Sequence, residues 1–112
     1  MDLFDDNVSV TIDDNGAIRS FFKKFSRLAD TVKTNIQHEL PEIIRQRPHK
    51  IKAAWGAKHQ GHTILEYKVV CKQQSFRVAY TQYHDEIKVI FISDVLVKRD
   101  FVKVLTASNI TD

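Results

Sequence analysis

The feature that most constrains the fold is a row of three β-rich runs between residues 63 and 93, separated by short polar breaks. Side chains alternate between the two faces of a strand, so each of the first two runs carries one apolar and one polar face. The apolar sets are Leu65, Tyr67, Val69 and Cys71 in the first run and Phe76, Val78 and Tyr80 in the second. The pattern predicts a β-hairpin with one face in a core.

The register of this hairpin follows from its polar face. A slip by one residue would bury Lys68 and Arg77, so the connecting loop must have an even length, either Gln73-Gln74 or residues 72–75. We favour the longer loop, because Gln-Gln lacks the positive-φ residues common in two-residue turns. Lys68 and Arg77 are then expected nearly opposite each other on a solvent-facing surface, where alanine at position 77 would cost little stability.

The third run follows a second loop of even length, which the same argument predicts over residues 83–86. Residues 87–93 are apolar on both faces, with Val89 and Phe91 on one side and Ile90 and Ile92 on the other. We expect this strand to be central in the sheet, or to be covered on its second side.

Helical periodicity precedes the sheet. Residues 8–12 alternate and predict a short strand, and Asp13, Asp14 and Asn15 then offer helix N-caps. Apolar residues at helical spacing predict a helix over residues 18–28. A tight turn near Ala29 would fold it back on a second helix as an antiparallel hairpin.

The second predicted helix covers residues 32–44 and begins at Asp30 as its cap. We expect Pro41 to kink this helix or to restart it, because proline removes one backbone hydrogen bond. Residues 49–62 lack a clear period and predict a basic loop around Trp55. Residues 98–107 predict a short helix at the end of the chain.

Composition predicts one domain over residues 1–112. Cys71 is the only cysteine, which excludes an internal disulfide and fits a reducing compartment, and we expect it to face the core. The acidic start, residues 1–7, does not resemble a secretory signal, and no apolar run approaches the roughly 20 residues that span a bilayer. These observations favour a cytoplasmic protein away from membranes, with residues 1–7 either disordered or folded over the basic face.

Charge is distributed unevenly along the chain. Residues 45–77 hold eight Lys or Arg and one acid, whereas residues 1–15 hold five aspartates and no Lys or Arg. A basic stretch of this density suggests a polyanionic partner, held by phosphate contacts and counterion release. The candidate nucleic-acid-binding residues are Lys50, Lys52, Lys58 and Lys72.

Two other motifs have competing interpretations. His49, His59 and His62 could contribute to a metal site, but no cysteine or suitably spaced carboxylate completes one, so we expect no metal. Trp55 could stack on a base, and we favour instead an anchor against the edge of the sheet.

The order of these elements, with ILEYKVV, SFRVAY and IKVIFIS followed by LVKRD, resembles the RelE/ParE superfamily of toxin–antitoxin toxins. The resemblance covers roughly residues 8–105 and rests on the order and spacing of short motifs. It implies an α+β, RelE-like fold with an N-terminal strand, a helical hairpin, a three-stranded antiparallel meander and a short C-terminal helix. It also implies a cognate acidic antitoxin, mRNA and the ribosome as partners.

The ribonuclease branch of that superfamily cleaves mRNA in the ribosomal A site without a metal or cofactor. A ribose 2′-hydroxyl attacks the adjacent phosphate, which requires a base, cations for the developing charge and an acid for the leaving 5′-oxygen. By resemblance, Arg77 takes the place of the phosphate-stabilising arginine, Lys68 that of an earlier basic residue, and Arg99 or Lys98 that of the one after the last strand. With Glu66 as a base, the candidate catalytic set is Lys68, Arg77, Lys98, Arg99 and Glu66.

One departure from the family pattern keeps a second function open. Ribonuclease members often carry a tyrosine or histidine near the C-terminus, and residues 101–112 contain neither. Glu66, Tyr83 and His84 remain as candidate bases. The alternative is therefore a non-catalytic binding module of the same fold, either gyrase-poisoning or RNA-binding.

Overall fold

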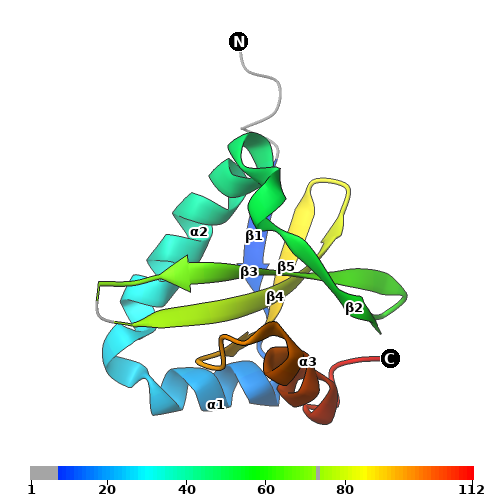
Figure 1. The fold of residues 1–112 in the computed structure, drawn as a ribbon. Helices are drawn as coiled ribbons and strands as arrows, with labels where there is room; N and C mark the ends of the chain where they lie inside the picture. The colour runs from blue at the N-terminus through cyan, green and yellow to red at the C-terminus, as the bar shows by residue number, and fades with distance from the viewer. Residues whose placement is uncertain (1–7, 73) are drawn as a thin grey trace.

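In the computed structural model of the protein, residues 8–72 and 74–112 are described. The expectations for residues 1–7 and for Gln73 lie outside this part of the chain. The described residues form a five-stranded sheet and three α-helices (Figure 1). The strands are β1 Ser9–Ile12, β2 Lys52–His59, β3 His62–Val70, β4 Ser75–Tyr83 and β5 Glu86–Ser93. The helices are α1 Gly16–Lys24, α2 Ala29–Gln46 and α3 Lys98–Ala107, with 3₁₀ turns at Ser26–Leu28 and Pro48–Lys50.

The strand order is β1-β5-β4-β3-β2. Strands β2 to β5 pair antiparallel in succession, whereas β1 pairs parallel to β5. The α+β class predicted from the sequence is confirmed, and the sheet as a whole is mixed. The prediction that the third β-rich run is central is also confirmed, because β5 lies between β1 and β4.

The predicted even length of the β3–β4 loop, which places Lys68 and Arg77 on one face, is confirmed. Lys68 is the direct register partner of Arg77, and the strands are joined by residues 71–74, so the loop is even in length but begins one residue earlier than predicted. The next connection is shorter than predicted. Tyr83 pairs with Glu86, which leaves a two-residue turn in which His84 has a φ of 53°.

A β-bulge in β5 changes which side chains share a face. Ala79 pairs with Phe91 and Tyr80 with Val89, so one extra residue of β5 lies between these pairs. Ile90 and Phe91 therefore both pack on one side of the sheet, whereas Val89 and Ile92 pack on the other. Strict alternation, which placed Val89 with Phe91, is wrong at this point.

Residues 49–62 are not the basic loop that their irregular pattern predicts, because most of them form strand β2. Its ladder with β3 is irregular between Ala53 and Lys58, where Trp55 and Gly56 have φ of 47° and 81°. This irregular segment breaks the alternation that would identify a strand. The β2–β3 turn has the positive φ values at both central residues that a tight hairpin requires.

The helical region differs from expectation in two details. Asn15 caps α1 by accepting a hydrogen bond from the Ile18 amide at 2.9 Å, as predicted. Asp30, however, lies in the first turn of α2 and is not its cap. Helix α2 also does not restart at Pro41, because it is continuous through this residue. Proline deprives the carbonyl of Gln37 of its helical partner, and Gln37 is solvent-exposed, so water can satisfy that carbonyl.

The two helices also do not lie antiparallel. In Figure 1, α1 runs along the lower edge of the molecule and α2 rises away from its end. Each helix instead packs against the sheet, because α1 contacts β5 while α2 contacts β1 and β3.

Both faces of the sheet are covered. The larger core lies between one face and helices α1 and α2, and it contains the apolar sets of β3 and β4. Cys71 belongs to this core, as predicted, and burial raises the pKa of its thiol. On the other face, α3 packs through Phe101 and Leu105 onto a smaller core. This smaller core contains Ala54, Ile64, Ala79, Ile90, Phe91, Phe101 and Leu105. Among the described residues, none of the helices is long and apolar enough to cross a membrane.

Candidate nucleic-acid interface

A buried ion cluster joins β3, β4 and the start of α3. Glu66 is fully buried, and its Oε1 atom lies 2.6 Å from Nη1 of Arg77. Its other carboxylate oxygen lies 3.6 Å from Nζ of Lys98, the first residue of α3. The sheet and α3 thus bring together three of the five predicted catalytic residues.

Arg77 also links the sheet to the segment that leads into α3. Its Nε atom donates a 2.9 Å hydrogen bond to the carbonyl of Leu96, and its side chain is only 19% exposed. The guanidinium is therefore held by two partners in a fixed position. Glu66 is enclosed and neutralised by two cations, which is not the setting of a base that substrate can reach.

Lys68 is the accessible cation of this group. It lies opposite Arg77 in the ladder, is exposed, and forms no ion pair among the described residues. Strand β2 begins opposite Glu66, so the part of β3 from Tyr67 to Val70 pairs with β4 alone. The ammonium group of Lys68 is thus carried on a strand edge open to solvent.

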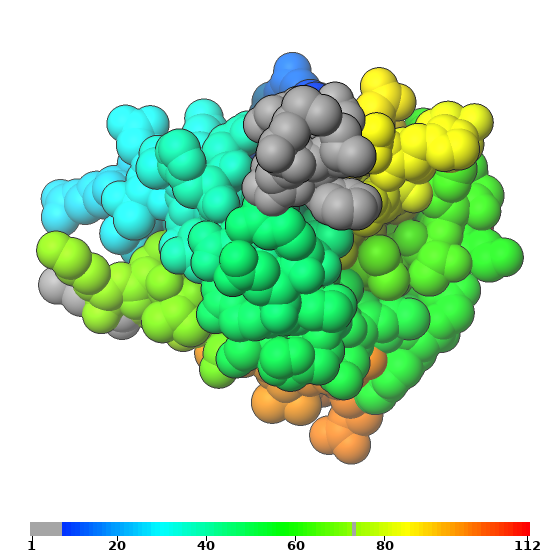
Figure 2. Space-filling model, turned by 90° about the horizontal axis from the view of Figure 1, so that it is seen from above, coloured from blue at the N-terminus to red at the C-terminus, as the bar shows by residue number. Residues whose placement is uncertain are grey.

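A hollow of about 430 Å³ lies beside this edge. Helix α2 and the turn after it contribute Glu39, Arg47 and Lys50 to the lining, and the sheet contributes Lys68 and Arg77. Glu39 pairs with Arg47 at 3.7 Å, which leaves a cationic excess in the hollow. Figure 2 looks down on this end of the molecule, where the end of α2 and the following turn form the centre of the surface.

Trp55 lies next to the ion cluster of Glu66, Arg77 and Lys98. The prediction that its ring anchors against the edge of the sheet is wrong. Its ring is 60% exposed, and Nζ of Lys98 lies 5.4 Å from the ring centroid. The positive φ of Trp55 turns the chain out of the regular ladder, which explains why its ring is not packed against the sheet. The contact with Lys98 is a cation–π interaction that links β2 to the start of α3.

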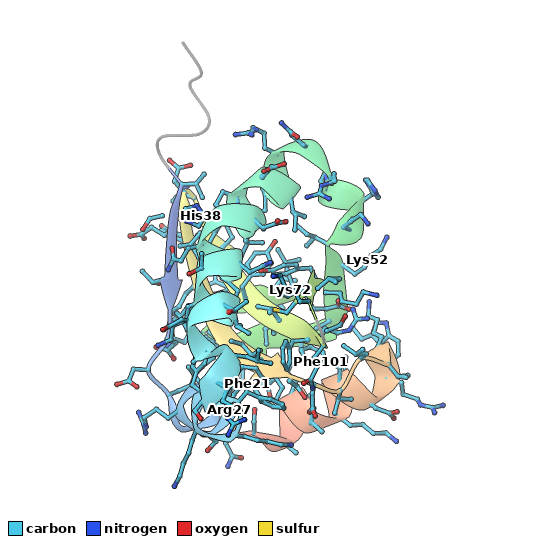
Figure 3. All side chains as sticks on the ribbon, turned by 90° about the vertical axis from the view of Figure 1, so that its left-hand side faces the viewer. Phe21, Arg27, His38, Lys52, Lys72 and Phe101 are labelled. Atoms are coloured by element: carbon cyan, nitrogen blue, oxygen red, sulfur yellow. The ribbon has the colours of Figure 1, made fainter. Side chains whose placement is uncertain are left out.

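The other predicted residues are spread over the surface. Arg99 is not part of the cluster, because its side chain is 71% exposed and lies 3.8 Å from Asp100. Lys52 is exposed opposite Glu66 in the ladder, at the start of β2, and Lys72 is exposed just after β3 (Figure 3). Lys58 lies at the far end of β2, where its carbonyl accepts a hydrogen bond from the amide of Asp112.

Sequence reasoning missed two residues beside the cationic hollow. Arg47 has the spacing of an ordinary surface arginine at the end of a helix, and only the packing of α2 brings it to the sheet edge. Tyr67 lies in the apolar set, yet its buried hydroxyl has no hydrogen-bond partner among the described residues. Burial raises the pKa of Tyr67 far above its usual range, helped by the nearby Tyr80 and Glu39.

The histidines are separated in the fold. Among the described residues, no three His, Cys, Asp or Glu side chains group closely enough to hold a metal ion. Nδ1 of His59 lies 2.6 Å from the carbonyl of Ile110 and donates to it, whereas the ring of His62 contacts Tyr83.

The last residue described, Asp112, holds the β2–β3 turn. Its carboxylate accepts hydrogen bonds from the amides of Gln60 and Gly61, at 2.6 and 2.8 Å. These two hydrogen bonds lower the pKa of Asp112, and the bond from the Gly61 amide has the larger effect. A carboxylate with a depressed pKa stabilises the fold above the ordinary Asp value of about 3.9 and loses that effect as pH falls through its own lower value.

We therefore expect the Gly61 amide to report a titration below the ordinary aspartate range. Following its NMR chemical shift from pH 6 to pH 2 should give a midpoint under about 3.9. The transition should vanish in Asp112→Ala. A midpoint at or above the ordinary value would mean that the carboxylate does not hold the turn in solution.

Comparison with known proteins gives no relative. No protein-family model, no curated protein and no solved structure matches the chain.

Proposed function

We propose that the protein is a RelE/ParE-type toxin that binds RNA through the cationic group around Lys68 and cleaves mRNA on the translating ribosome without a metal. The observation that carries this proposal is the placement of Lys68 directly opposite Arg77, on an open strand edge beside a cationic hollow. An exposed ammonium next to a fixed guanidinium suits the two non-bridging oxygens of a phosphodiester, which share one negative charge.

The fold is consistent with the proposal. The chain shares an N-terminal strand, successive antiparallel strands and a C-terminal helix with the fold that the resemblance implies. It differs from that fold in its mixed sheet and in its two helices, which do not form a hairpin. The basic stretch over residues 45–77, with eight Lys or Arg and one acid, is also an expected feature of an RNA-binding protein. A toxin of this kind would be neutralised by an acidic antitoxin, and it would act in the cytoplasm.

In the proposed reaction, the ribose O2′ forms a bond to the adjacent phosphorus, and the bond from phosphorus to O5′ breaks. The proton of the 2′-hydroxyl passes to water and O5′ takes a proton from water, so the products are a 2′,3′-cyclic phosphate and a free 5′-hydroxyl. Lys68 and Arg77 would stabilise the charge that develops on the phosphate oxygens. Lys98 would hold the buried Glu66 in place, so that Glu66 orients Arg77 rather than accepting the proton.

A second candidate function is favoured by one specific observation. The only carboxylate in the cluster, that of Glu66, is fully buried and neutralised by two cations. Glu39, the acid that lines the neighbouring hollow, pairs with Arg47. This arrangement suits a binding module that holds RNA without cleaving it. The two candidates share the RNA-binding step and differ in the cleavage products.

The binding step predicts a specific effect of Lys68→Ala. We expect weaker binding to a single-stranded RNA and a salt dependence that is shallower by about 0.7 in the plot of log K against log salt concentration. This is the change expected when one phosphate contact is lost. Fluorescence anisotropy with a labelled RNA, repeated at several salt concentrations, measures both quantities.

The matched control is Lys103→Ala, which removes the same charge from an exposed position on α3. This variant should keep the salt slope of the unmodified protein. Equal slopes for Lys68→Ala and the unmodified protein would remove Lys68 from the RNA interface.

A further inference from the structure

A second hollow lies on the face of the sheet that carries Arg77, beyond the part of this face that α3 covers. It measures about 290 Å³, near the lower limit of small-ligand sites, and is lined by residues from β2–β3, β4 and β5. We call it the Tyr83 hollow. Its lining includes Gln60, His62, Thr81, Tyr83, Glu86 and Lys88. Figure 2 shows the β4–β5 turn (yellow) beside the β2–β3 segment (green) that borders it.

Rings form one wall of the Tyr83 hollow. Tyr83 is 56% exposed, and its ring centroid lies 5.3 Å from that of His62 and 4.3 Å from that of His84. An exposed tyrosine supported by neighbouring rings is a stacking platform for a flat ligand. The backbone that carries the ring is fixed, because Tyr83 pairs with Glu86 in the β4–β5 ladder.

The polar wall carries opposite charges. Lys88 and Glu86 are two residues apart on β5, so both side chains face the hollow, and no ion pair joins them among the described residues. Nζ of Lys88 makes only a long contact, 3.4 Å, with Oε1 of Gln60. Mixed charge does not favour a phosphate, but it offers a donor and an acceptor side by side.

We infer that the Tyr83 hollow binds one unpaired nucleobase of the RNA, with a preference for guanine. The base would stack on Tyr83, O6 of guanine would accept from Lys88, and N1–H and N2–H would donate to the carboxylate of Glu86. Adenine, cytosine and uracil do not present one acceptor beside two donors on a single edge. The inference rests on the proposed RNA binding and adds a base-recognition site to it.

The two sites can act on one RNA strand. Arg77 and Tyr83 are six residues apart on β4 and share a face, so their Cα atoms lie roughly 20 Å apart along the strand. A short stretch of extended single-stranded RNA can therefore place a phosphate at Lys68 and a base at Tyr83.

The test compares two labelled RNAs of equal length, oligouridine and the same sequence with one central guanine. We expect the full chain to bind the guanine-containing RNA about tenfold more tightly. Tyr83→Ala should weaken its binding about tenfold, whereas Tyr83→Phe, which keeps the ring, should bind within about twofold of the unmodified protein. Glu86→Gln should bind both RNAs about equally.

The variants lie at solvent-exposed positions, so each should keep the thermal unfolding midpoint of the unmodified protein. Tyr83→Ala binding as tightly as the unmodified protein would overturn the inference, as would a guanine preference that survives Glu86→Gln. In either case Lys68→Ala would still weaken binding to both RNAs if the proposed function holds. A chain that binds neither RNA would overturn both.

Discussion

Replacing Arg77 with alanine is expected to lower the free energy of unfolding by about 3–5 kcal/mol. The change would leave the buried carboxylate of Glu66 with only the longer contact to Lys98, and it would also remove the hydrogen bond to the Leu96 carbonyl. Breaking one side of a buried ion pair is costly, because the remaining charge is uncompensated. Urea unfolding followed by circular dichroism measures the difference.

Alternation alone led us to expect a small effect, because it placed Arg77 on a solvent-facing surface. That premise is wrong, since the side chain is only 19% exposed. A second variant separates the charge effect from lost packing. Adding Glu66→Gln to Arg77→Ala removes the uncompensated charge, so the double variant should be more stable than Arg77→Ala alone. A cost below about 1 kcal/mol for Arg77→Ala would show that this ion pair does not stabilise the fold in water.

Replacing Phe101 with alanine is expected to cost about 3–5 kcal/mol as well. Phe101 is fully buried between α3 and the sheet, and its ring lies 5.7 Å from that of Phe91. The change leaves a cavity in the smaller core, and it weakens the packing that holds α3 over the sheet. Figure 3 shows Phe101 on the inner side of α3.

The control for this prediction is Val104→Ala, in the same helix. Val104 is 37% exposed, so its replacement should change the free energy of unfolding by only about 0.5 kcal/mol. Hydrogen exchange should show faster exchange of α3 amides in Phe101→Ala. Equal stability of the two variants would contradict the packing of α3 described above.

The sequence predicted the centre of the sheet well, because alternation there is regular. A buried face fixes the parity of Tyr67 and Val78, and parity places Lys68 opposite Arg77. Asn15 was predictable for a similar reason, since N-capping depends on local chemistry.

Irregular backbone explains most of what could not be predicted. The positive φ at Trp55 interrupts the side-chain alternation of β2, so the sequence pattern did not identify this strand. The bulge near Ile90 places Phe91 on the opposite face from the one that alternation predicts. Alternation also cannot reveal what covers a face. A solvent-facing surface was expected around Arg77, but the side chain is held by Glu66 and by the carbonyl of Leu96. We therefore expect its guanidinium to stabilise the fold in addition to any role with RNA.

The candidate site was partly predictable for the same reasons. Glu66, Lys68 and Arg77 share a face by parity, and the structure adds Lys98 through the packing of α3. Arg47 could not be found, because its approach to β3 depends on how α2 crosses the sheet. Arg99 was selected as a neighbour of Lys98, yet consecutive helical residues point in different directions.

Mapping the 5′ ends of a translated message by primer extension, after induced expression of the chain, tests the central proposal most directly. We expect growth arrest and new ends inside codons with the unmodified chain and with Lys103→Ala, and neither with Lys68→Ala. Lys68 is exposed, so its loss should leave the protein folded, which circular dichroism can verify. Expression of folded, unmodified protein without any new ends would contradict mRNA cleavage and favour a non-catalytic binding module.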